Sequence, residues 1–145
     1  MVKILINKLE KDVKLPSYKT SGSSGMDLMA YMGEKIIIKP GKIALIPTGI
    51  RIAIPEKYEV QIRPRSGLAA KKSISVLNTP GTIDSDYRGE IKIILINLGN
   101  RLFEVNPGDR IAQMVLCPVA IGKLKEVKIL PKTFRGKRGF GSTGK

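Results

Sequence analysis

The chain has 145 residues, which is enough for one domain with a substantial core. It has one cysteine, Cys117, and no histidine, which excludes an internal disulfide, Ser-His triads, histidine general bases and His/Cys zinc sites, and with them the zinc-type nucleobase deaminases. The formal net charge of +14 indicates either a polyanionic partner or surface lysines that serve solubility alone. Any catalysis must use carboxylates, amides, hydroxyls, basic groups or a metal held largely by the substrate.

Short segments rich in Ile, Leu and Val recur along the chain, separated by Pro/Gly turns such as Pro47-Thr48-Gly49 and Asn106-Pro107-Gly108-Asp109. Segments of this length and composition predict β-strands. The predicted strands are 2–6, 35–39, 43–46, 50–54, 58–62, 91–97, 111–116 and 127–130. Short strands at this spacing favour an all-β sandwich or barrel.

Two of these segments differ in how their apolar residues alternate. In 58–62 the apolar positions alternate with polar ones, which predicts a strand with one face in water. In 91–97 both faces are apolar for much of the length, so something must cover the second face. That cover is either a second sheet of the same chain or a neighbouring subunit.

The one helix that the sequence predicts is 67–72, with Ser66 at the N-cap position. It is too short to be stable without tertiary support. From Pro131 onward the chain is rich in glycine and basic residues, with Phe140 between two glycines. We therefore expect a β-rich catalytic domain over 1–130 and a flexible C-terminal arm over 131–145.

The segment 81–90 places two carboxylates, Asp84 and Asp86, and the ring of Tyr87 in a turn bounded by glycines. Such a hairpin could hold a planar ring and position a water molecule. The plain alternative is an Asp/Ser/Gly turn whose side chains bond to their own backbone.

Phosphate-binding features occur in 65–67, at a junction of strand and helix. Helical N–H groups and the hydroxyl of Ser66 can donate to phosphate oxygens, Arg65 adds charge, and Gly67 allows close approach to the backbone. The alternative is an ordinary N-cap preceded by a surface arginine. Gln113, in an apolar segment, is either a hydrogen-bonded residue within a sheet or a functional amide.

The basic composition does not by itself select a partner. The lysines are spread along the chain, and three Phe, four Tyr and no Trp offer few platforms for stacking bases, so no specific nucleic-acid partner is predicted. A triphosphate substrate fits the charge equally well. No apolar run is long enough to span a membrane and the N-terminus lacks a signal-peptide layout, so we expect a soluble, cytoplasmic or otherwise intracellular protein without a membrane partner.

Five segments together resemble, in order and spacing, the five motifs of the trimeric deoxyuridine triphosphatases (dUTPases). They are 24–30 (SGMDLMA), 64–69 (PRSGLA), 81–90 (GTIDSDYRGE), 110–115 (RIAQMV) and 135–144 (RGKRGFGSTG). The resemblance covers essentially the whole chain. One departure is Arg138, which stands where the family usually has a small residue, most often glycine.

The resemblance assigns roles to individual residues. It implies that Asp84 activates the attacking water and that Tyr87 packs under the deoxyribose, so that a 2′-hydroxyl would clash. It also implies that Asp27 acts either on the water shell of the metal or on an arginine of the site. The substrate-binding positions that it implies are Arg65, Ser66, Gly67, Asn78, Thr82, Ile83, Tyr87, Lys92, Gln113, Arg135, Phe140, Ser142 and Thr143.

The reaction that the resemblance implies is hydrolysis of dUTP to dUMP and pyrophosphate, with Mg²⁺ carried by the triphosphate, in a jelly-roll homotrimer with shared active sites. Two alternatives stay open. One is a basic nucleic-acid-binding module or a catalytically silent regulatory trimer. The other is a metal-free dCTP deaminase of the same fold, for which Glu90 is the only nearby candidate for the catalytic glutamate.

Overall fold

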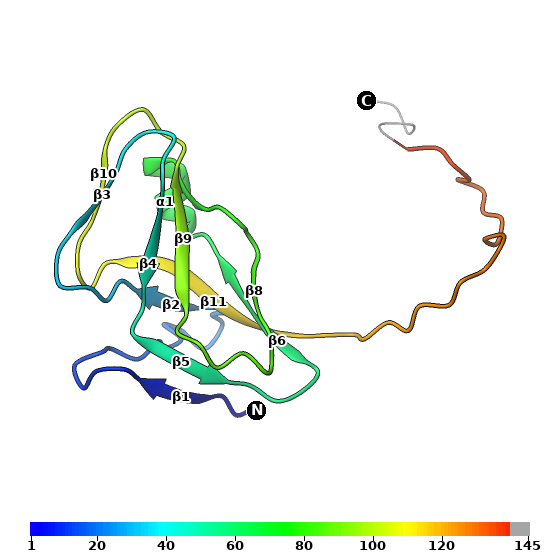
Figure 1. Cartoon of the computed structure of the whole chain (residues 1–145), viewed down its shortest axis with the longest axis horizontal. Helices are drawn as coiled ribbons and strands as arrows, with labels where there is room; N and C mark the ends of the chain where they lie inside the picture. Colours follow the sequence, from blue (N-terminus) through cyan, green and yellow to red (C-terminus); the bar gives the residue numbers. More distant parts are fainter. Residues whose placement is uncertain (140–145) are drawn as a thin grey trace.

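The computed structural model describes residues 1–139. Its described part consists of β-strands and one short helix (Figure 1). In chain order the elements are β1 (Leu5–Lys8), β2 (Met26–Met29), β3 (Ile36–Ile38), β4 (Ile43–Pro47), β5 (Ile50–Ala53), β6 (Tyr58–Arg63), α1 (Ser66–Lys72), β7 (Ile74–Val76), β8 (Gly81–Ile83), β9 (Lys92–Asn97), β10 (Phe103–Val105) and β11 (Arg110–Pro118).

Two larger sheets form the body of the domain. One has the strand order β2-β11-β6-β8 and the other β4-β9-β7, while β1 pairs with β5 and β10 pairs with β3. All of these strand pairs are antiparallel. The prediction of an all-β fold is confirmed, and it is an open layered arrangement and not a closed barrel.

One hydrophobic core joins the two larger sheets. Val60 and Ile62 of β6 and Met114 of β11 belong to the same buried cluster as Ile93 and Leu95 of β9. The alternation expected for 58–62 is seen at its centre, because Val60 and Ile62 are buried while Glu59 and Gln61 are half-buried and not fully in water. In β9 the second face is only half-covered, at Ile94 and Ile96.

Short strands were the ones that sequence patterning missed. β2, β7, β8 and β10 were not predicted, and each has only three or four residues. The first strand is shifted, to Leu5–Lys8 from the expected 2–6, because its register is set by pairing with β5. Apolar alternation over so few residues gives too little signal to distinguish a strand from a turn.

The predicted strand at 127–130 is wrong for the isolated chain. The structure has no strand there, and Ile129 is 84% exposed. Figure 1 shows that the chain leaves the body after β11 and runs away from it through this region. The apolar residues here have no partner strand within their own described chain, so the local β-propensity is not realised.

The start of the helix also differs from the prediction. Arg65, and not Ser66, is the N-cap: it has extended backbone angles (φ −88°, ψ 126°) and makes no capping bond with its side chain. The carbonyl of Arg65 accepts the first helical bonds, from the N–H groups of Leu68 and Ala69. Ser66 is therefore the first helical residue.

The described residues include no helix long and apolar enough to cross a membrane.

Candidate active site

Asp84 lies directly after β8, exposed at a surface hollow of about 580 Å³. Antiparallel pairing of β8 with β6 holds the hairpin in place, with Ile83 opposite Val60. The hollow brings together predicted residues and some that the sequence did not single out. Its lining is Leu45, Arg51, Thr82, Ile83, Asp84, Tyr87, Glu90 and Lys92. Four predicted substrate-binding residues therefore share one hollow with the predicted catalytic carboxylate.

The ring of Tyr87 is held in a defined place by its own hairpin. Its hydroxyl donates to the carbonyl of Glu90 at 3.0 Å. The ring lies over Gly89 so closely that a Cβ added there would collide with the Tyr87 hydroxyl oxygen. Glycine at 89 is thus required for this ring position, and Tyr87 keeps an exposed surface of 43% for contact with another molecule.

Glu90 joins the hairpin to the turn between β4 and β5. Its Oε1 accepts the backbone N–H of Gly49 at 2.9 Å, and its Oε2 is 3.7 Å from Nζ of Lys92. Next to it, the buried hydroxyl of Thr48 donates to the carbonyl of Ile91 at 2.6 Å. The Glu90 carboxylate is therefore engaged in holding the hairpin, and this argues against its use as the catalytic glutamate of a deaminase.

Asn78 lies beside the start of the hairpin. A Cβ added to Gly81 would be 3.2 Å from Nδ2 of Asn78, so the amide packs closely against that glycine. A small cavity of about 40 Å³ is lined by Asn78 and Gly81 together with Thr82, Ile83 and Lys92, among others. The hairpin thus offers an amide side chain and backbone groups at one place, as base recognition requires.

A second group of charged side chains surrounds Asp27 on β2. Nε of Arg65 donates to Asp27 Oδ1 at 2.9 Å, and Nη1 of Arg110 donates to Asp27 Oδ2 at 3.3 Å. Arg65 Nη1 also donates to the carbonyl of Arg110 at 3.0 Å. Of the two roles considered for Asp27, its contacts fit the one that orients an arginine. Because 65–67 is the segment expected to bind phosphate, we call Asp27, Arg65, Ser66, Gly67, Arg110 and Gln113 the phosphate seat.

Arg110 was not among the predicted site residues, and its contact with Asp27 depends on a β-bulge. Strand alternation alone would place residues 110 and 113 on opposite faces. The register of β11 against β2 shifts between Arg110 and Ala112, so that Gln113 pairs with Asp27 while Arg110 also reaches its carboxylate. No local signal in the sequence marks that shift.

Gln113 braces the strand that leads into α1. Its Nε2 donates to the carbonyl of Pro64 at 3.0 Å. Its Oε1 occupies the space beside Gly25, where an added Cβ would be only 2.6 Å away. Gln113 therefore touches the residue that precedes Arg65 and fixes the backbone at the entrance to the helix.

Ser66 and Gly67 form the first turn of α1, where backbone N–H groups lack helical partners. A Cβ added to Gly67 would meet no atom within 4 Å. Glycine here is therefore not required by internal packing. The open space leaves room for an oxyanion close to the backbone.

Arg135 does not reach either group of residues in the described chain. Its Nε donates to the carbonyl of Arg138, and Arg138 Nε donates back to the carbonyl of Arg135. The Arg138 guanidinium also lies 5.1 Å from the centre of the Phe134 ring. The remaining arm residues predicted to bind substrate, Phe140, Ser142 and Thr143, lie outside the described residues.

The hairpin and the phosphate seat are far apart on one chain. Asp27 of β2 and Arg63 of β6 both pair with Gln113 of β11, so they lie at the same height in the sheet. Asp84 follows Ile83, which pairs with Val60, so it lies four residues further along β6. At about 3.3 Å per residue this is roughly 13 Å along the strands, and three strand spacings of about 4.8 Å separate β2 from β8 across the sheet. Ideal strand geometry thus places the backbone of Asp27 about 20 Å from that of Asp84.

A metal cage built from protein side chains is not found in residues 1–139, where no three His, Cys, Asp or Glu residues cluster for this purpose. Both carboxylate oxygens of Asp27 already accept hydrogen bonds from arginines. The residues present fit a cation whose ligands come mainly from a bound phosphate chain and water.

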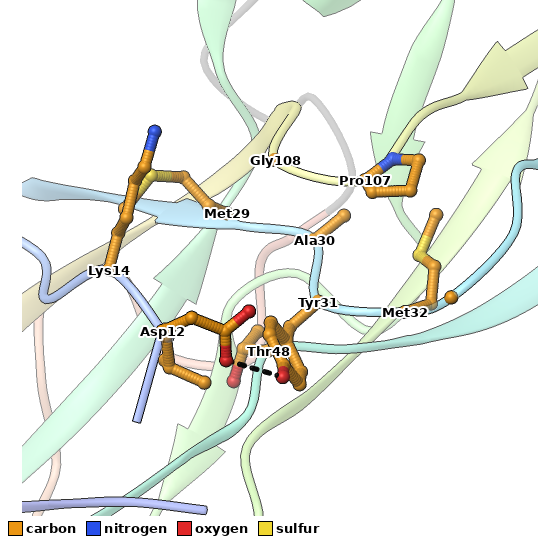
Figure 2. Close-up of a pocket in the computed structure, with 11 residues that line it drawn as sticks. Asp12, Lys14, Met29, Ala30, Tyr31, Met32, Thr48, Pro107 and Gly108 are labelled. Carbon is orange, nitrogen blue, oxygen red and sulfur yellow. Dashed lines mark hydrogen bonds between the residues drawn. The ribbon is translucent and has the colours of Figure 1, made fainter. Parts of the chain in front are cut away.

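A separate hollow of about 360 Å³ lies beside β2 and the turn before β11 (Figure 2). There the hydroxyl of Tyr31 donates to Asp12 Oδ1 at 2.8 Å, and this hydrogen bond raises the pKa of Tyr31. None of the residues expected to bind substrate lines this hollow. The one carboxylate in its lining, Asp12, already accepts the hydrogen bond from Tyr31.

Both the sequence and the fold are similar to those of known proteins. The model of the dUTPase family matches residues 11–144. A deoxyuridine 5′-triphosphate nucleotidohydrolase of Rickettsia prowazekii is 55% identical, covering 99% of this chain and 98% of the relative, and one of Fusobacterium nucleatum is 52% identical, covering 94% and 93%. A solved structure, the G164S mutant of the Staphylococcus bacteriophage 80alpha dUTPase with dUpNHpp, superposes with a TM-score of 0.88 at 25% identity over 98% of each chain. The chain belongs to the dUTPase family, and it is an enzyme that hydrolyses dUTP to dUMP.

Proposed function

We propose that Asp84 is the general base of this reaction and that it acts on a water aligned with the α-phosphorus of dUTP. The carboxylate accepts a proton as the water oxygen bonds to the α-phosphorus, the bond from that phosphorus to the bridging oxygen breaks, and pyrophosphate leaves with the electron pair. The observation that carries this proposal is the position of Asp84, exposed at the mouth of the 580 Å³ hollow beside the ring of Tyr87.

The hairpin supplies recognition of deoxyuridine. Tyr87 packs against the deoxyribose where a 2′-hydroxyl would clash, and its fixed position over Gly89 supports this role. Asn78 and the backbone groups of Thr82 and Ile83 bond the uracil edge, and Lys92 contacts the substrate from the returning strand. A narrow turn at Gly81 would leave no room for a 5-methyl group.

The phosphate seat binds the triphosphate. Ser66 and the N–H groups at the start of α1 donate to phosphate oxygens, in the open space beside Gly67. Arg65 is held by Asp27 and supplies positive charge, while Gln113 orients the backbone before it. Donors fixed in this way stabilise the charge that develops in the transition state.

Mg²⁺ is the metal of the reaction, carried by the phosphates of dUTP. When bound it neutralises phosphate charge and orients the phosphate chain. Asp27, whose two oxygens each already accept from an arginine, would contact the ion through water. The solved structure of a mutant dUTPase from phage phi11, which shares 22% identity with this chain, reveals how that protein coordinates a structural Mg(II) ion.

The active enzyme is a homotrimer in which each site combines parts of different chains. The separation of about 20 Å between Asp27 and Asp84 supports this, since the base and the phosphate seat must act on one substrate. Exposed apolar side chains at Ile43 and Leu45 on β4 supply a surface for a neighbour. The half-covered Ile94 and Ile96 of β9 extend that surface.

The arm completes the neighbour's site. Residues 1–130 form the catalytic domain and 131–145 the arm, in which Arg135 grips the terminal phosphate, Ser142 and Thr143 add hydroxyl donors and Phe140 covers the uracil. The exposure of Ile129 and Leu130, ahead of the arm, supports docking on another chain. Nucleotide pools are intracellular, and we place the enzyme there.

Product analysis with matched substrates tests the proposed reaction. With Mg²⁺, dUTP should give dUMP and pyrophosphate, and UTP, dTTP and dCTP should be cleaved poorly. In ¹⁸O-labelled water, the label should appear in dUMP, because the water attacks the α-phosphorus. Label in pyrophosphate alone would place the attack on the β-phosphorus and overturn the mechanism.

A further inference from the structure

Basic residues from three separate segments gather at one end of the domain. They are Lys39 and Lys42 in the turn between β3 and β4, Lys71 and Lys72 at the end of α1, and Arg101 in the loop after β9. In the view of Figure 1, α1 and these loops lie at the end opposite β1. We call these five residues the basic end. The linear sequence hides the cluster because its members are up to 62 positions apart.

One buried side chain holds the three segments together. Asn97 is 1% exposed, and its Nδ2 donates to the carbonyls of Ile38 and Arg101 at 2.9 and 2.7 Å. Its backbone carbonyl accepts the N–H of Gly41, and the neighbouring Leu98 N–H donates to the carbonyl of Ser73, just after α1. The basic end is therefore a fixed feature of the fold and not a chance meeting of mobile loops.

The cations of the basic end have no acidic partners. All five are exposed, and none takes part in the ion pairs found between residues 1 and 139. Lys71, Lys72 and Arg101 line a hollow of about 300 Å³ whose remaining lining contains no carboxylate: Ser73, Gly99, Asn100, Leu102 and Phe103. Lysines at the C-terminal end of α1 interact favourably with the helix dipole, but this does not account for the cations of the other two segments.

We propose that the basic end binds the phosphate backbone of nucleic acid without reading its sequence. Five unpaired cations exceed what one phosphate group needs, and they match a polymer that presents several phosphates in a row. The hollow at the basic end has one aromatic residue in its lining, Phe103, which is half-buried. Nucleic acid bases therefore have little aromatic surface on which to stack. Contact is therefore with the backbone, which positions the protein without giving specificity.

The basic end is distinct from the phosphate seat. α1 begins at the seat with Ser66 and ends at Lys72, which places them about 9 Å apart along the helix axis at about 1.5 Å per residue. None of the five cations belongs to the residues proposed to bind dUTP. The five cations can thus be replaced without changing a residue proposed to bind dUTP, and nucleic acid binding here would hold the enzyme near DNA, the polymer into which dUTP is incorporated.

The test measures binding of a fluorescent 20-base-pair DNA duplex to the full chain at several salt concentrations, with fluorescence anisotropy as the readout. With five backbone contacts, log K should fall with log salt with a slope of about −4.5, an affinity loss of about 500-fold between 50 and 200 mM salt. The triple variant Lys71→Gln, Lys72→Gln, Arg101→Gln should reduce the slope to about −2. Its rate of dUTP hydrolysis and its thermal unfolding should match those of the parent.

A matched control changes the same number of charges in the C-terminal segment, with Lys123→Gln, Lys125→Gln and Lys128→Gln. This control should keep the parental slope. Absence of DNA binding at 50 mM salt, or an equal loss in both triple variants, would overturn the proposal.

Leu98 and Leu102 are exposed near the basic end, so vesicles of phosphatidylserine and phosphatidylcholine form a second arm of the experiment. Vesicle binding that depends on the three cations, with DNA binding unaffected by them, would equally overturn it.

Discussion

Complementation between two inactive variants tests whether one active site is built from two chains. Asp84→Asn removes the base but leaves the phosphate seat intact. Arg65→Gln removes the guanidinium that bonds to Asp27 at 2.9 Å but leaves the hairpin intact. The two altered positions lie about 20 Å apart on one chain, so neither change should disturb the other group. Each variant alone should lose at least about 100-fold in kcat.

The recovered activity has a definite size. In trimers assembled at random from equal amounts of both chains, a site is intact when its hairpin comes from the Arg65→Gln chain and its seat from the Asp84→Asn chain. Each condition holds for half of the chains, so about a quarter of the parental activity should return. The assay is pyrophosphate release after joint refolding, with mixed trimers verified by native mass spectrometry. Activity that stays at the level of the separate variants in verified mixed trimers would refute the shared site.

Four further changes test single parts of the site. Asp84→Asn should retain binding of a non-hydrolysable dUTP analogue, measured by calorimetry, and parental turnover would show that another group is the base. Tyr87→Ala should lower the dUTP/UTP ratio of kcat/KM, and an unchanged ratio would place the sugar elsewhere. Glu90→Ala leaves the Gly49 N–H without its acceptor and should lower the free energy of unfolding by about 1–3 kcal/mol, measured by thermal unfolding. Glu90→Gln keeps an acceptor and should lower it less. Equal losses in the two variants would contradict the role of this hydrogen bond in holding the hairpin. Removing 132–145 should abolish activity with little change in unfolding temperature, and a large drop would show that the arm supports the core.

The longer strands were predictable because their signals are local. β4, β5, β6, β9 and β11 contain enough alternating or continuous apolar residues to be found within one or two positions. Their neighbours β2, β7 and β8 are short and rely on pairing for their structure, as when Gly81 lies opposite Ile62. Pairing is set by contacts between distant segments, and composition does not reveal it.

The charged groups of the site show the same division. Asp84 and Tyr87 occur in one glycine-bounded segment and could be selected from it. Arg110 could not be selected, because its approach to Asp27 depends on the bulge in β11. The hydrogen bond from the Gly49 N–H to Glu90 joins residues 41 positions apart, and the sequence gives no sign of it either.

The segment 127–130 shows why a strand prediction can be wrong for one chain and still carry information. Its apolar residues favour a strand, yet in the isolated chain Leu130 is 77% exposed and no strand of the described residues pairs with it. A folded chain that keeps such residues in water gives up the free energy of burying them, about 1.5–3 kcal/mol for each large side chain. An adjacent subunit can recover it. The exposed segment, the apolar β4 edge and the distance between base and phosphate seat are therefore independent features that the same assembly would explain.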